Sequence, residues 1–211
     1  MTDNAKPIPA ELPDSAQFDR TGAWALLTEW TLTESLRKHA LAVEACVVAY
    51  GAAEADRLGL AGEARERLIT LYSATALLHD FDYERHPSLE EHPFVGVNEL
   101  ARLGWPEALR TAILGHATYS GVPRNSHLAR VLFACDELSG FLTACALVKP
   151  SRAIADVEPA SVRKKLKDKA FARGVSRLDV FQGAEELGVP LEEHIEFCLR
   201  AMRGRAGELG L

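Results

Sequence analysis

A long run of helix-forming residues, from Leu36 to Gly59, restricts the fold of this chain more than any other feature. The run is rich in Ala, Leu and Val, and its apolar residues recur with the spacing of one helix face. No stretch of alternating β-branched residues is long enough to predict a strand. The sequence therefore predicts an all-α fold. We expect helices over residues 26–31, 36–59, 64–79, 93–103, 106–116, 127–148, 162–172, 177–188 and 190–203.

Breaks in this helical pattern divide the chain into three parts. Residues 1–20 contain three prolines among polar residues and predict an N-terminal arm. Residues 21–148 carry the long apolar helices and are expected to form the main helical domain. A Lys-Pro-Ser sequence then ends the last long helix, so residues 149–211 are expected to form a C-terminal helical extension packed on the same domain.

Composition excludes several classes of protein. The formal net charge of −6 disfavours non-specific binding to nucleic acid, which needs a basic surface. The chain has neither a basic N-terminal segment followed by an apolar stretch nor a run of 18 apolar residues, which predicts a cytoplasmic protein with no membrane partner. A homodimer is left open. The four cysteines are in apolar helical contexts and are expected to be buried, reduced thiols: Cys46, Cys135, Cys145 and Cys198.

Polar side chains inside or at the ends of apolar helices are the candidate functional residues. His39 and Asp136 are each inside a predicted helix, and His79-Asp80 ends another. A bare carboxylate on an apolar face is costly unless something pairs with it, and one shared divalent cation would satisfy all four side chains. Imidazole and carboxylate ligands suit Mn, Fe, Ni, Co or Zn better than Ca.

In this order, His39, His79-Asp80 and Asp136 resemble the metal-binding pattern of the HD-domain superfamily of metal-dependent phosphohydrolases. The resemblance covers roughly residues 35–145 and implies an HD-domain helical bundle over residues 21–148. The Lys-Pro-Ser sequence and the later Ser-Val-Arg-Lys-Lys are similar to the C-terminal extension of a group of uncharacterised predicted HD hydrolases, and name no substrate.

Two further histidines, His92 and His116, resemble ligands of two-metal HD enzymes, including the HD-GYP branch. That branch has a His-His-Glu motif, a Gly-Tyr-Pro loop and a Lys after its His-Asp pair. This chain keeps His92-Pro93, Gly96 and a Gly-Val-Pro loop. It lacks the second His and the Glu of the first motif, the Tyr of the loop, and the Lys. Cleavage of a cyclic dinucleotide is therefore not expected. The resemblance implies one or two ions, with Asp80 bridging them and His92 and His116 on the second ion, or else beside a single ion.

The implied reaction is hydrolysis of a phosphomonoester or phosphodiester of a nucleotide or another small phosphorylated substrate by metal-activated water, with Mg²⁺ as a further option in substrate binding. Asp80, Asp82 and Glu84 are the candidate catalytic residues, because they belong to or follow the His-Asp pair. Five cations of the C-terminal part are candidates for holding the phosphate: Lys149, Arg152, Lys164, Lys165 and Lys167.

Two alternatives stay open at this point. Some HD-fold proteins with six ligands in the order His, His-Asp, His, His, Asp are di-iron oxygenases, and this chain has that order. The other alternative is a non-catalytic helical binding module. The remaining histidines, His86, His127 and His194, are expected to face solvent or, for His127, to lie just behind the ligands.

Overall fold

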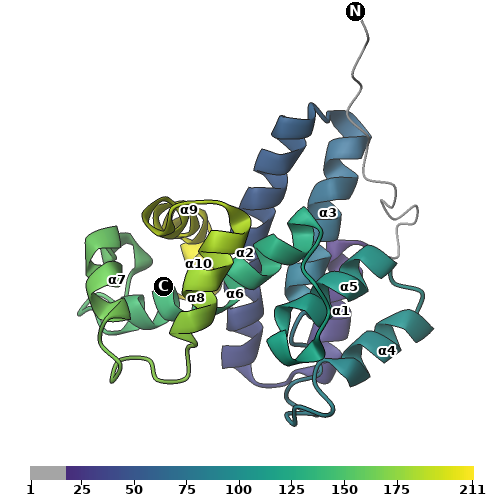
Figure 1. Ribbon diagram of the computed structural model, residues 1–211, viewed down its shortest axis with the longest axis horizontal. Helices are drawn as coiled ribbons and strands as arrows, with labels where there is room; N and C mark the ends of the chain where they lie inside the picture. The colour runs from purple at the N-terminus through teal and green to yellow at the C-terminus, as the bar shows by residue number, and fades with distance from the viewer. Residues whose placement is uncertain (1–17) are drawn as a thin grey trace, which may run out of the picture.

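The computed structural model describes residues 18–211, so most of the arm predicted over residues 1–20 lies outside the described part. Within that part the secondary structure is helical, with no strand, which confirms the predicted all-α class (Figure 1). The α-helices are α1 (Arg20–Trp30), α2 (Glu34–Leu58), α3 (Gly62–Leu78), α4 (Phe94–Arg102), α5 (Glu107–His116), α6 (His127–Leu147), α7 (Pro159–Leu166), α8 (Arg177–Leu187), α9 (Leu191–Arg203) and α10 (Ala206–Leu209). Two 3₁₀ turns join some of them, η2 (Thr118–Ser120) and η3 (Ile154–Asp156).

The two longest helices, α2 and α6, lie at the centre of the molecule. Figure 1 shows α1, α3, α4 and α5 on one side of this pair and α7, α8, α9 and α10 on the other. Local sequence explains where the central helices begin and end. Ser126 accepts the N–H of Ala129 and so caps the start of α6, and Gly59 ends α2 in the left-handed conformation at φ 69°, which glycine adopts without strain.

The C-terminal part shares the core of the rest of the chain. Helix α8 packs along α6, and α9 packs against α2. One continuous cluster of buried apolar residues extends from Ala23 in α1 to Leu209 in α10. No helix among residues 18–211 is both long enough and apolar enough to cross a lipid bilayer.

A buried carboxylate links the first helices to the last. Glu44 in α2 is 1% exposed and accepts bonds from Arg20 in α1, from Ser73 in α3 and from Arg205 just before α10. Charge-assisted bonds from two guanidinium groups offset the cost of burying this carboxylate. The network therefore ties the C-terminal end of the chain to the central helix α2.

Two predicted helices were wrong in extent. The first helix begins at Arg20, well before residue 26, because Asp19 caps it by accepting the N–H of Gly22. This also moves the end of the predicted arm back from residue 20. The basic helix stops at Leu166 instead of continuing to residue 172, since Arg177 draws the following segment into a loop by donating to the carbonyls of Phe171 and Val175.

Candidate metal centre

Six side chains that the sequence singled out come together from five separate parts of the fold. The histidines and aspartates are positioned mostly by helices: His39 in α2, His79 at the C-terminal cap of α3 with Asp80 after it, His92 before α4, His116 at the last position of α5, and Asp136 in α6. Their ligand atoms fall into two groups that share Asp80.

The first ligand group consists of His39, His79, Asp80 and Asp136, whose ligand atoms all lie within 4.8 Å of one another. Oδ1 of Asp136 lies 3.0 Å from Nε2 of His39 and 3.4 Å from Nε2 of His79. Oδ2 of Asp80 lies 3.9 Å and 3.4 Å from the same two nitrogens. Two imidazoles and two carboxylates around one small volume are a ligand set suited to a divalent transition metal.

The second ligand group consists of Asp80, His92 and His116, again within 4.8 Å of one another. Here Asp80 uses its other oxygen, because Oδ1 lies 3.4 Å from Nε2 of His92 and 3.2 Å from Nε2 of His116. Asp80 thus turns one oxygen toward each group. This is the arrangement in which one carboxylate can serve two neighbouring ions.

The rings of three histidines are held in one orientation by bonds from their Nδ1 atoms. His79 donates to the carbonyl of Ala76 (2.7 Å) and His116 to the carbonyl of Ile113 (2.5 Å), each one turn back along the chain. His92 bonds a carboxylate that is described below. With Nδ1 protonated, Nε2 is left with the lone pair that a metal needs.

A buried nitrogen without a partner supports this ligand assignment. Nε2 of His79 has no hydrogen-bond partner, although the side chain is fully buried. Its nearest polar neighbours are Oδ2 of Asp80 and Oδ1 of Asp136, each 3.4 Å away, so a cation held by the first ligand group would satisfy the nitrogen and both carboxylates at once. The donor set and this unpaired atom together fit a metal site.

The electrostatics of the cluster are those of imidazoles packed between carboxylates. Burial alone would lower the pKa of His79, yet the carboxylates of Asp80 and Asp136 outweigh burial and raise that pKa to about 10. Burial likewise opposes, but does not prevent, the rise in the pKa of His92 to about 9 next to Asp80 and Asp82. The neighbouring imidazoles hold the pKa of Asp80 well below its usual range against the effect of burial.

Asp82, a predicted catalytic residue, is buried and holds His92. Its Oδ1 accepts from Nδ1 of His92 at 2.8 Å and its Oδ2 accepts the N–H of Gly96 at 2.7 Å. A Cβ on Gly96 would lie only 2.7 Å from Cγ of Asp82, so this close approach requires a glycine. The structure therefore gives Asp82 a positioning role toward His92.

The other predicted catalytic carboxylate, Glu84, is committed to the backbone before α2. Its Oε2 accepts the N–H groups of Leu32 and Thr33, each at 2.9 Å. Only the third predicted catalytic residue, Asp80, belongs to the ligand groups themselves.

Solvent reaches the centre from the side of the carboxylates and His39. The side chains of Asp80 and His39 are 26% and 24% exposed, whereas that of His79 is fully buried. A cavity of about 290 Å³ adjoins His39 between α2 and α6, with residues 209–211 at its rim. Lys38 lines this cavity, and its ammonium lies 2.9 Å from Oε1 of Glu34. Lys38 directly precedes His39 and was not among the cations predicted to bind phosphate.

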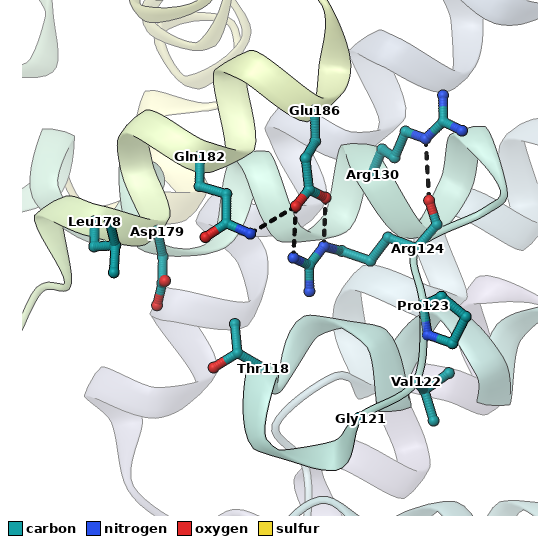
Figure 2. A pocket seen from close by; sticks show the side chains of 10 residues that line it. All are labelled: Thr118, Gly121, Val122, Pro123, Arg124, Arg130, Leu178, Asp179, Gln182 and Glu186. Atoms are coloured by element: carbon teal, nitrogen blue, oxygen red, sulfur yellow. Dashed lines mark hydrogen bonds and ion pairs between the residues drawn. The ribbon is translucent and has the colours of Figure 1, made fainter.

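A larger cavity, of about 710 Å³, lies between the loop over residues 118–124 and α8 (Figure 2). None of the six metal-ligand candidates lines it. Figure 2 shows that its main cation is already paired: Arg124 makes two bonds to Glu186, at 2.6 and 2.7 Å, and Gln182 donates to the same carboxylate. The guanidinium of Arg124 also stacks on the ring of Phe133.

The five predicted phosphate-binding cations, from Lys149 to Lys167, are not brought to the metal ligands. None of them lines the cavity beside His39. Lys164 and Lys165 belong to α7, which Figure 1 shows across α2 and α6 from α4 and α5. The ammonium of Lys165 lies over the ring of Phe171 at 4.1 Å, so it packs locally.

Of the three remaining histidines, one contradicts its prediction. His86 is a partly exposed loop residue that pairs with Glu91, as expected. His127 is half-buried and bonded to the hydroxyl of Tyr72. His194 was expected at the surface but is fully buried, because it falls on the apolar face of α9.

Comparisons with protein-family models, curated proteins and solved structures find no match to this chain. The proposals that follow therefore rest on the residues and distances described above.

Proposed function

We propose that this protein is a two-metal hydrolase of the HD type, acting on a phosphomonoester or phosphodiester of a nucleotide or a small phosphorylated metabolite. The observation that carries the proposal is the division of Asp80 between two ligand groups, with Oδ2 toward His39 and His79 and Oδ1 toward His92 and His116. Two adjacent divalent ions are a recurring solution for phosphoester hydrolysis.

Each ligand group has a separate task in this proposal. His39, His79, Asp136 and Oδ2 of Asp80 would hold one ion, and His92, His116 and Oδ1 of Asp80 the other. When bound, Mn²⁺, Fe²⁺, Ni²⁺, Co²⁺ or Zn²⁺ would activate water near neutral pH and polarise a phosphoryl oxygen. Asp82 would keep the Nε2 lone pair of His92 pointed at its ion through the Nδ1 bond.

The cavity beside His39 supports an anionic substrate of modest size. His39 of the first ligand group lines it, and Lys38 brings an ammonium to its wall. A phosphate in this cavity would draw Lys38 away from Glu34, since a phosphate is a stronger partner than an exposed carboxylate. In this proposal Lys38 binds the phosphate, which is the role that the sequence predicted for the C-terminal cations.

The experiment combines metal analysis with a panel of phosphoesters tested in the presence of Mn²⁺, Ni²⁺, Co²⁺ and Mg²⁺. Asp80→Ala should abolish hydrolysis and reduce the metal content by two ions per chain. His92→Ala should remove one. Lys38→Met should raise KM while Lys149→Met, a cation outside the cavity, should not. Full activity of Asp80→Ala would refute the proposal.

The same geometry supports a second candidate, a di-iron oxygenase, because all six ligands of the order His, His-Asp, His, His, Asp converge. Protein purified with iron would then consume oxygen with a non-phosphate substrate and leave every phosphoester of the panel intact. A non-catalytic module would carry no metal and would keep the same stability after treatment with a chelator.

A further inference from the structure

A second group of metal-ligating side chains lies in the core, apart from the centre described above. Cys46 of α2, Cys135 of α6, and His194 and Cys198 of α9 meet there, and each of the four is 0% exposed. We call these four residues the sulfur cluster. Three helices that are far apart in sequence contribute to it, so it was not foreseen from the spacing of the cysteines.

Three members of the sulfur cluster are close enough to bind one ion. The ligand atoms of Cys135, His194 and Cys198 all lie within 4.8 Å of one another. Sγ of Cys198 lies 3.7 Å from Nδ1 of His194. With Zn–S about 2.3 Å and Zn–N about 2.0–2.1 Å, the S···N edge of a tetrahedron is about 3.6 Å. The thiol of Cys46 donates to the backbone carbonyl of Cys198 at 3.8 Å, so it lies beside these three ligands without belonging to their group.

His194 is oriented as a metal ligand is. Its Nε2–H donates to the carbonyl of Ala134 at 2.9 Å, so the lone pair is on Nδ1, on the side of Cys198. A backbone carbonyl that fixes the far nitrogen is the usual support of a metal-bound imidazole. The hydroxyl of Tyr50 donates to Nδ1 at 2.8 Å, and a metal on Nδ1 would take the place of that bond.

We propose that the sulfur cluster is a structural site for a thiophilic divalent ion, Zn²⁺ above all, with Cys135, Cys198 and His194 as its ligands and the Cys46 thiol packed beside them. Soft sulfur ligands select Zn²⁺ over the harder cations. Binding releases the thiol protons of Cys135 and Cys198 to solvent, and two thiolates balance the charge of the ion, as a site inside an apolar core requires. No bond is oxidised or reduced.

The complete burial of all four side chains assigns this site to structure and not to catalysis. A catalytic zinc keeps a position open for water or substrate, whereas no side chain of the sulfur cluster is open to solvent. The ion would join α2, α6 and α9, and Cys135 is the residue before Asp136. It would therefore anchor the stretch of α6 that presents Asp136 to the first ligand group.

Cobalt spectroscopy tests the proposal independently of the proposed function. Protein is purified from cells grown with Co²⁺, because a closed site must be filled during folding. A sulfur-to-cobalt charge-transfer band in the near ultraviolet is expected, and the histidine–carboxylate centre cannot produce it, since it has no sulfur ligand. In the Asp80→Ala variant the band should persist with one ion per chain. A wild-type protein without the band would overturn the proposal.

Variants then identify the ligands. Cys198→Ser and Cys135→Ser, each combined with Asp80→Ala, should lower the bound metal from one ion per chain to none and abolish the band. Cys145→Ser is the matched control, because Cys145 is equally buried in α6 but is not a member of the sulfur cluster. A band that survives in the Cys198→Ser protein would overturn the assignment, and the wild-type spectrum decides the proposal even if that variant does not fold.

Discussion

Replacing Gly96 with alanine should weaken the second ligand group without touching any of its ligands. A Cβ at this position would lie 2.7 Å from Cγ and 2.8 Å from Oδ2 of Asp82, and 2.8 Å from Cε1 of Phe81. Ordinary van der Waals contact begins at 3.4 Å, so the carboxyl group of Asp82 must retreat by about 0.7 Å. Its 2.8 Å bond to Nδ1 of His92 would lengthen to about 3.5 Å, beyond hydrogen-bonding distance.

The loss of such a supporting bond typically costs 10–100-fold in metal affinity, and overpacking costs about 1–3 kcal/mol of stability. Calorimetric titration of chelator-treated protein with Mn²⁺ should therefore give one weakened site and one unchanged site in Gly96→Ala. Gly207→Ala is the matched control, since a Cβ there meets no atom within 4 Å. Two unchanged affinities in a folded Gly96→Ala protein would refute the role of Asp82.

Three further predictions concern metal, protons and the Glu44 network. Removing the metal with a chelator should lower the free energy of unfolding in urea by about 2.7 kcal/mol per site that was filled at 100 times its Kd, and an unchanged value would contradict metal binding. Because the pKa values of His79 and His92 are raised to about 10 and about 9, both are protonated at pH 7 in the metal-free protein, and an incoming ion must displace about two protons. The affinity for the metal should accordingly fall as the pH is lowered. Calorimetry in buffers of different ionisation enthalpy should detect the protons that His79 and His92 release. No such protons would be released if these histidines were not ligands. Glu44→Ala should cost about 1–3 kcal/mol in urea denaturation, because it removes the acceptor of the buried Ser73 hydroxyl and of two guanidinium groups, whereas the exposed Glu63→Ala should cost little.

The convergence of His39, His79, Asp80 and Asp136 was predictable because each is a polar side chain in or at the end of an apolar helix, whereas His92 and His116 were expected only from the resemblance. The division of these ligands between two groups that share Asp80 was expected only from the resemblance to two-metal HD enzymes, since residue spacing alone does not say which oxygen of Asp80 faces which helix. Glu84 was predicted to be catalytic because it follows Asp80 closely in sequence, yet its carboxylate accepts the N–H groups of residues 32 and 33. Consecutive turns over residues 80–86 separate the two carboxylates, so Glu84 faces the backbone before α2 instead of the metal ligands.

His194 shows how local composition can hide a helical pattern. The residue stands among glutamates, which suggested the surface, but the buried positions of α9 are His194, Ile195, Cys198, Leu199 and Met202. These recur at helical spacing and define the buried face. The end of α7 could not have been found in this way, because Arg177, which organises the loop after it, lies beyond the helix itself.

The bonds from His79 to Ala76 and from His116 to Ile113 have a consequence for how such a centre is assembled. The last carbonyls of a helix have no partner within the helix and normally turn to water. Here the carbonyls of Ala76 and Ile113 accept from the rings of His79 and His116. The orientation of each ring therefore depends on its own helix end and not on a neighbouring helix. When α3 and α5 pack together, each brings one imidazole whose direction is set by its own helix end, so the precision of the centre depends on two intact helix termini.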